Sequence, residues 1–228
     1  MYAERPSRLP GAVVWRNAVP DGGVLGRVLP DGCLDLLWVD DTLLVAGPDT
    51  AAYVPGGRPG SVFVGVRFAP GAGAAIIGVP ANELRDRRVP LADVWPAGRV
   101  RRLTTRMASA ADPVVELERV AAERVAELGP PDAKIAAIVR GMRAGSSVAR
   151  TAAVVGLTER ALHRRCLAAF GYGPKTLARI LRLNRAVALA RGGTPFATVA
   201  AIAGYADQAH LARDVRALAG VPLGALTS

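Results

Sequence analysis

The feature that most constrains the fold is a pattern that occurs twice after residue 145. In each copy an alanine stands four residues before a glycine, and a leucine follows the glycine by six or seven residues. The members are Ala152, Gly156 and Leu162 in the first copy, and Ala200, Gly204 and Leu211 in the second. A small alanine lets two helices cross closely, a glycine permits the positive φ of a sharp turn, and a leucine anchors the second helix. The pattern therefore predicts two helix-turn-helix units.

Between the two copies lies an uninterrupted helical segment from Pro174 to Arg191. Proline is tolerated at the first position of a helix, so Pro174 marks its start. Its 18 residues, at a rise of about 1.5 Å each, span roughly 27 Å. Successive major grooves on one face of B-DNA are about 34 Å apart. Thr158 and Asp207 are suited to cap the second helix of each unit. We therefore expect a long helix that holds the two units about one groove apart.

The net charge of +10 is concentrated after residue 129. Residues 1–129 hold equal numbers of basic and acidic side chains, whereas residues 130–228 hold fourteen basic and four acidic ones. A positive field confined to one part of a chain favours a polyanionic partner such as nucleic acid.

Composition and length exclude several classes of protein. The 228 residues suffice for two modest domains, and a hydrophobic content of 51% excludes a disordered chain. The sequence has no apolar run long enough to span a membrane and no secretory signal. Cys33 and Cys166 are the only cysteines, so we expect no disulfides and a reducing cytoplasm.

The first part of the chain has a different pattern. Short apolar runs separated by turn formers predict strands at residues 12–15, 33–39, 42–46 and 62–68, and helical periodicity predicts helices at 97–110 and 113–128. Paired prolines after Gly129 mark a boundary. The prediction is an α+β protein: a domain of residues 1–129 with a small antiparallel β-sheet or partial barrel and helices, and an all-α double helix-turn-helix domain of residues 130–228.

Residues 130–228 resemble the AraC/XylS-type DNA-binding domain, in which two helix-turn-helix units share a linker helix. The segments that carry the resemblance are Gly171–Pro174, Arg179–Ala186 and Gly204–Arg213. Cys166 and Val215 depart from it, because the family usually has an aromatic residue at these positions. The resemblance implies a DNA-binding transcription regulator, with no enzymatic activity and no cofactor.

The first part resembles an uncharacterised domain that often precedes this DNA-binding domain in actinobacterial regulators. The matching segments are Arg27–Cys33, Ala46–Thr50, Gly65–Gly71 and Leu91–Trp95. This resemblance implies no particular ligand.

Two sets of residues are predicted to contact DNA. Arg160, His163 and Arg164 share one helix face by spacing, and the resemblance places that face in the major groove. The resemblance also implies that four residues of the second recognition helix face the bases: Gln208, Ala209, Ala212 and Arg213. Four further basic residues are predicted to contact phosphates: Lys175, Arg179, Arg182 and Arg216.

An effector pocket in the first domain is a weaker hypothesis. Its candidate residues are Asp31, Cys33, Asp35, Trp38 and Arg67, although strand alternation favours a core position for Trp38 and a turn for Asp31. Metal binding is disfavoured, because both histidines lie in the DNA-binding domain. The expected partner is double-stranded DNA, with a small-molecule effector, RNA polymerase and a second copy of the chain left open.

Three functions compete. The leading hypothesis is a sequence-specific regulator that places two recognition helices in successive major grooves. The alternative is a non-specific architectural protein that uses only its basic field. An enzyme with an alkyl-accepting cysteine is disfavoured, because the sequence lacks the clustered cysteines that would activate the thiol.

Overall fold

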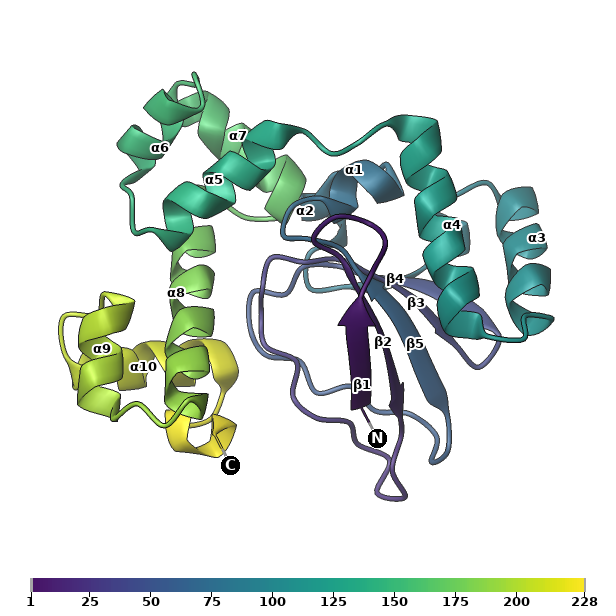
Figure 1. Ribbon diagram of the computed structural model, residues 1–228, viewed down its shortest axis with the longest axis horizontal. Coiled ribbons are helices and arrows are strands. Elements are labelled where there is room, and N and C mark those ends of the chain that lie inside the picture. Colours follow the sequence, from purple (N-terminus) through teal and green to yellow (C-terminus); the bar gives the residue numbers. More distant parts are fainter. Residues whose placement is uncertain (1, 228) are drawn as a thin grey trace.

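The computed structural model describes residues 2–227, and its N-terminal part is built on one antiparallel sheet (Figure 1). The strands are β1 (Tyr2–Pro6), β2 (Val13–Ala18), β3 (Asp35–Val39), β4 (Thr42–Ala46), β5 (Val62–Arg67) and β6 (Arg88–Pro90). They lie in the order β1-β2-β5-β3-β4-β6, and every neighbouring pair is antiparallel. The predicted antiparallel sheet is thus confirmed, as an open sheet whose edges are β1 and β6.

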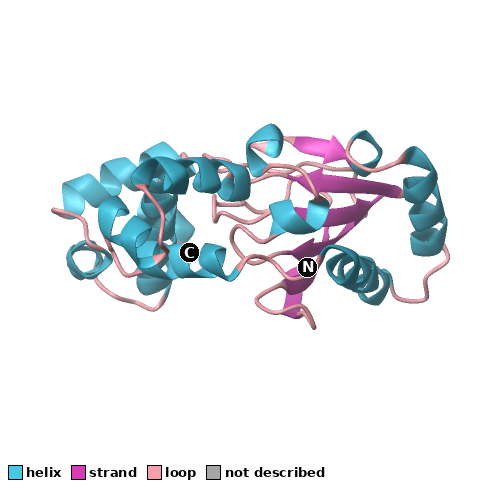
Figure 2. Ribbon diagram, turned by 90° about the horizontal axis from the view of Figure 1, so that it is seen from above, coloured by secondary structure: helices cyan, strands magenta, loops and turns pink. Residues whose placement is uncertain are grey.

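Helices cover one face of this sheet. They are α1 (Gly73–Ile77), α2 (Ala81–Leu84), α3 (Ala97–Ala108) and α4 (Pro113–Leu128), with a 3-10 turn, η1, at Leu91–Asp93. Alternate strand residues such as Leu36, Trp38, Val45 and Val66 point to these helices and form the core with Leu117 of α4. Figure 2 shows the sheet standing between α3 and α4 on one side and the C-terminal helices on the other.

The opposite face of the sheet is also largely apolar and is covered by two loop segments. Residues 23–28 and 53–57 run antiparallel to each other, with isolated bridges that pair Val24 with Gly56 and Val28 with Tyr53. Val28 N donates to Tyr53 O over 2.8 Å, and Tyr53 N returns a bond to Val28 O over 2.9 Å. We call these two segments the flap. The flap explains why β3 is apolar on both faces, a pattern typical of strands buried on both sides.

The C-terminal part consists of helices, as predicted. They are α5 (Ala133–Arg143), α6 (Val148–Val154), α7 (Glu159–Phe170), α8 (Pro174–Arg191), α9 (Phe196–Ala203) and α10 (Gln208–Ala219), followed by the 3-10 turn η2 (Leu223–Leu226). The pairs α6–α7 and α9–α10 form the two helix-turn-helix units, and α8 has the predicted bounds.

The long helix α8 belongs to two separate cores. Its first half contributes Leu177 and Ile180 to a cluster with α5, α6 and α7. Its second half contributes Leu183 and Val187 to a cluster with α9 and α10. Each unit is therefore packed independently on one half of the same rod.

Two strands, β1 and β6, were not predicted. β1 is polar and wholly exposed, and β6 has only three residues, so neither has a recognisable apolar pattern. β3 starts at Asp35 rather than Cys33, because Cys33 and Leu34 belong to the preceding loop. Among residues 2–227, no helix is both long and apolar enough to cross a membrane.

Candidate nucleic-acid interface

The turn of the first helix-turn-helix unit is fixed by local contacts. Gly156 adopts a φ of 67°, and Thr158 Oγ1 accepts a hydrogen bond from Ala161 N over 3.2 Å. This bond caps the N-terminus of α7. Ala152 and Leu162 are buried in the core of the unit, as the sequence predicts.

The second unit repeats this arrangement. Gly204 adopts a φ of 83°, and Asp207 Oδ1 accepts from His210 N over 2.6 Å at the start of α10. Ala200 and Leu211 are buried in the core of this unit. Both predicted N-caps are therefore confirmed, and both recognition helices begin at a capped, exposed N-terminus.

The side chains predicted to read bases are all exposed. On α7 these are Arg160, His163 and Arg164, and on α10 they are Gln208, Ala209, Ala212 and Arg213. The neighbouring Arg165 is instead paired with Asp132, the N-cap residue of α5, and so joins α7 to the start of α5. No direct contact with DNA is described, so the role of each exposed residue stays a prediction.

The two recognition helices pack at opposite ends of the connecting helix. In Figure 1, α7 lies beyond the start of α8, and α10 crosses behind α8 near its end. Their exposed basic faces are therefore carried at the two ends of one rod.

The four predicted phosphate contacts fall into two groups. Lys175 and Arg216 are exposed and form no ion pair within residues 2–227. Arg179 donates from Nε to the buried Asp214, and Arg182 lies 3.7 Å from the same carboxylate. These two arginines thus hold α10 against α8, a role that the sequence did not predict.

Asp214 has a further partner in the turn of the second unit. The Tyr205 hydroxyl donates to Asp214 Oδ2 over 3.0 Å, and the Arg182 guanidinium lies 4.5 Å from the centre of the Tyr205 ring. Burial raises the pKa of the Tyr205 hydroxyl, and the neighbouring Asp214 raises it further. The hydroxyl therefore stays protonated and keeps its role as the donor.

The two departures from the AraC-type pattern lie in the cores of the units. Cys166 and Val215 are completely buried. Burial raises the pKa of the Cys166 thiol to about 12, so it stays protonated and packs as a small apolar side chain.

The N-terminal part contacts the two units at different places. At the first unit, Gly71 approaches Phe170 and Ile135 so closely that a Cβ would lie 2.3 Å from the Phe170 ring. Arg85 Nη1 also donates to Gly171 O over 3.2 Å. These contacts place the C-terminal end of α7 against α1 and α2, leaving its N-terminal end free.

The second unit is contacted by loops next to the flap. Ala52 N donates to Leu218 O of α10 over 2.7 Å, and Asn184 Nδ2 of α8 donates to Pro30 O over 3.0 Å. Leu29 packs against the core of the second unit. The residues directly flanking the flap are therefore in contact with the second unit.

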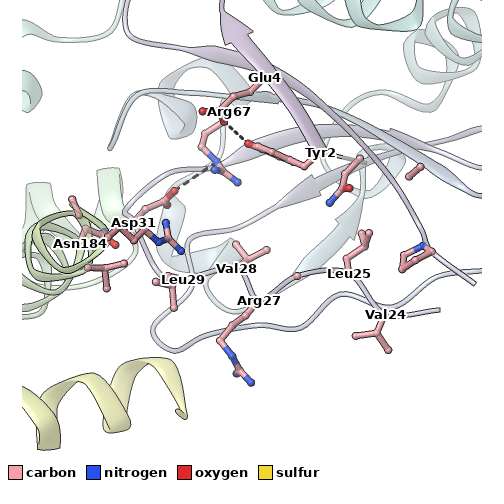
Figure 3. A pocket seen from close by; sticks show the side chains of 17 residues that line it. Tyr2, Glu4, Val24, Leu25, Arg27, Val28, Leu29, Asp31, Arg67 and Asn184 are labelled. Carbon is pink, nitrogen blue, oxygen red and sulfur yellow. Dashed lines mark hydrogen bonds and ion pairs between the residues drawn. The ribbon is translucent and has the colours of Figure 1, made fainter. Parts of the chain in front are cut away.

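Two adjoining cavities occur at the face of the sheet that lies under the flap. The sheet-face cavity, of about 340 Å³, lies between the strands and the flap, and Asp35 and Arg67 line it. The interdomain cleft, of about 780 Å³, lies between the flap and α8, and is lined by Asp31, Arg67 and Asn184 among others (Figure 3). The two cavities share Arg67, which lies between them.

Two of the five predicted pocket residues line neither cavity. Trp38 points to the helix-covered face, because it alternates with Leu37 in β3, and so it belongs to the core. Cys33 is buried, and burial raises the pKa of its thiol well above the ordinary value. No cluster of three or more His, Cys, Asp or Glu side chains within residues 2–227 is arranged to hold a metal ion.

Comparison with known protein families gives two matches. Residues 151–227 match a helix-turn-helix domain family, and residues 12–90 match a domain of unknown function, DUF6597. No curated protein matches the chain significantly. Together with the two capped units, the first match defines the class: the chain is a helix-turn-helix, DNA-binding transcription regulator. The helix-turn-helix domain at residues 151–227 is of the AraC type, and residues 12–90 match the DUF6597 domain.

The chain is also similar to several solved structures. An apo form of a single-substitution variant of ToxT from Vibrio cholerae strain SCE256 is 10% identical, with a TM-score of 0.51 over 97% of this chain and 98% of that chain. Wild-type ToxT from the same strain, bound to an unsaturated fatty acid, gives 11% identity and a TM-score of 0.47, over 99% of this chain and 94% of that chain. A probable AraC family transcriptional regulator from Rhodopseudomonas palustris CGA009 is 22% identical over 42% of this chain and 95% of that chain, with a TM-score of 0.37. At 10% identity, the similarity to the apo ToxT variant shows the fold alone.

Proposed function

We propose that the protein is a sequence-specific transcription regulator that inserts α7 and α10 into successive major grooves of double-stranded DNA. The observation that carries this proposal is the arrangement of two capped, exposed recognition helices at the two ends of α8. At about 1.5 Å per residue, the rod spans roughly 27 Å, close to the spacing of about 34 Å between successive grooves.

The exposed residues suit direct readout of bases. Arg160 and Arg164 on α7 would each contact a guanine through O6 and N7, with His163 beside them. On α10, Gln208 suits adenine and Arg213 suits guanine. Ala209 and Ala212 are small enough for the backbone of α10 to approach the methyl group of a thymine.

Selection of bound duplexes from a random pool, followed by affinity measurements, tests this proposal. We expect an operator that binds in the nanomolar range and far more tightly than random duplex. Arg160→Ala and Arg164→Ala should each lose about 1–3 kcal/mol of discrimination at one base pair, because one bidentate contact disappears.

Lys175→Ala provides the control for these variants. Lys175 is exposed at the start of α8 and is expected to contact a phosphate, so its loss should weaken operator and random duplex equally. If the wild-type protein binds every duplex with the same affinity, the architectural alternative is correct and the proposal is wrong.

We further infer that the N-terminal part, residues 1–129, is a sensing domain. Its support is the cavity under the flap and the contact between the flap region and the second unit. Contact with RNA polymerase, a homodimeric state and the absence of enzymatic activity stay predictions, although the family is one of transcription regulators.

A further inference from the structure

The sheet-face cavity has the properties of a binding site for a small organic molecule. Its volume of about 340 Å³ is at the lower end of the range of about 300–1,000 Å³ found for small-molecule sites. Its walls are mainly apolar and aromatic: Trp15, Leu37, Leu44, Tyr53 and Phe63 line it. Such walls favour a flat, aromatic occupant.

The sequence provides this cavity through strand alternation and one glycine. Trp15 and Phe63 point to the flap, whereas their neighbours Val14 and Val64 point to the helix-covered core. Gly65 is paired with Trp15, and a Cβ at Gly65 would lie 2.3 Å from the indole ring. The glycine therefore lets the indole lie flat over the neighbouring strand and form the floor of the cavity.

Arg67 supplies the polar group of the site. Its Nε interacts with Asp35 and lies 3.6 Å from Asp31. Asp35 also accepts a hydrogen bond from Trp15 Nε1 over 2.8 Å. Within residues 2–227, the two terminal Nη groups of Arg67 donate to no protein acceptor, and the side chain lines both cavities. Figure 3 shows Arg67 and Asp31 facing each other beside α8 and the flap. The forked guanidinium is thus free to donate to a ligand oxygen.

The charges around Arg67 determine which kind of oxygen fits. Asp31 and Asp35 already provide two carboxylates for one guanidinium, and Glu4 lines the adjoining cleft. Burial raises the pKa of Asp31; Arg67 offsets part of this rise, and the nearby Asp35 adds to it. A third carboxylate from a ligand would meet the same repulsion, whereas a neutral carbonyl oxygen would not.

The cavity wall is continuous with the contact to the second helix-turn-helix unit. Tyr53 lies in the flap and lines the cavity, and its neighbour Ala52 donates to Leu218 O of α10. On the other segment, Val28 lines the cavity, and Pro30 accepts from Asn184 of α8. The first unit is held by α1 and α2 instead, through Gly71 and Arg85. The segments that flank the flap therefore contact α10 and α8 directly, whereas α7 is held by other contacts.

We propose that the sheet-face cavity binds a small, neutral aromatic molecule whose carbonyl oxygen accepts a hydrogen bond from Arg67, and that occupancy of the cavity shifts α10 relative to α7 through the flap. This inference deepens the proposed function, because its regulatory half depends on DNA binding. The spacing of the two recognition helices, and hence operator affinity, then depends on the ligand.

Calorimetric titration without DNA tests the ligand class. The probes are two matched pairs, acetophenone with benzoate and 2-acetylnaphthalene with 2-naphthoate. We expect at least one ketone to bind, and its carboxylate to bind at least about tenfold more weakly because of the uncompensated charge. Arg67→Lys keeps the positive charge but loses the fork, and should weaken ketone binding by about fivefold or more.

Variants of the cavity wall locate the bound ketone. Leu44→Trp fills the cavity and should abolish binding, and Leu128→Trp, at the exposed end of α4, is the matched control. Phe63→Ala removes an aromatic wall and should weaken binding without adding bulk. If no ketone binds, if the carboxylates bind as tightly, or if neither wall variant changes the affinity, the proposed site is wrong.

Operator affinity with and without saturating ketone tests the transmission. We expect a change of at least about fivefold in the wild-type protein, the lower end of typical coupling between sites. Asn184→Ala and Ala52→Pro each remove one bond between the flap region and the second unit, and should reduce this change while leaving ketone affinity unaltered. An unchanged operator affinity at saturation would contradict the transmission. A protein that binds ketone but has no preferred operator would contradict only the proposed DNA-reading function.

Discussion

At the scale of single residues, buried charges join elements that lie far apart in the sequence. Asp214 joins α8, α10 and the turn of the second unit, and Glu118 joins the start of the chain to α4. A sequence shows that such residues are charged but not which partner each will meet. Arg179 and Arg182 were therefore predicted to contact phosphates, as exposed basic residues usually do, and their pairing with Asp214 became evident only from the fold.

Glu118 gives a prediction about acid stability. It accepts from Arg5 Nη2 over 2.9 Å, from Ser7 Oγ over 2.7 Å and from Arg8 N over 2.6 Å. Burial alone would raise the pKa of Glu118, but these hydrogen bonds outweigh it and lower the pKa from 4.5 to about 2. The depressed pKa means that the charged form stabilises the fold above pH 4.5, and that this contribution is lost as pH falls from 4.5 to about 2.

Urea unfolding of the wild-type protein and Glu118→Gln between pH 7 and pH 2 checks this. At pH 7 the variant should be less stable by about 1–3 kcal/mol, because a hydrogen-bonded buried carboxylate has been replaced. The two free energies of unfolding should converge as the pH falls through the window. Parallel curves over that range would show that Glu118 is not the group responsible.

At the scale of secondary-structure elements, local signals predicted the C-terminal part well and the N-terminal part less completely. The bounds of α8 and both N-caps follow from Pro174, Thr158 and Asp207, because helix starts depend on residues adjacent in sequence. β1 could not be predicted, since its exposed edge position requires no apolar residues and all five of its residues are exposed.

The two N-caps give a prediction at this scale. Thr158→Ala and Asp207→Ala each remove one capping bond and should each lower the free energy of unfolding by about 1 kcal/mol. The caps lie in different units with separate cores, so the effects should add in the double variant. Thr158→Ser and Asp207→Asn keep an acceptor and should stay close to wild type in denaturant titrations. A double variant as stable as either single one would contradict the independence of the units.

At the scale of the whole molecule, the sequence predicted which residues of α7 and α10 would be exposed, but it did not predict the cavity. Exposed residues on capped helices follow from periodicity and from the repeated pattern, which are both local. The cavity depends on the flap, whose two segments are separated in the chain and meet only through isolated bridges at Val24 and Val28. Asp35 and Arg67, which line the cavity, were nevertheless among the predicted pocket residues.

The concentration of positive charge in the C-terminal part predicts the salt dependence of DNA binding. Each neutralised phosphate releases counterions, so the slope of log affinity against log salt changes by about 0.9 per contact. Lys175→Gln and Arg216→Gln should each reduce the slope by about this amount, because both side chains are exposed and free of ion pairs within residues 2–227. Arg179→Gln should reduce it by less than about half as much, since Asp214 already neutralises much of its charge. Lys134→Gln, an exposed residue of α5 outside the predicted contacts, is the matched control and should leave the slope unchanged. Equal slopes for the Lys175 and Lys134 variants would mean that the start of α8 does not face the DNA backbone. A reduction of the slope by the full amount in Arg179→Gln would mean that the Arg179 guanidinium leaves Asp214 for a phosphate when DNA binds.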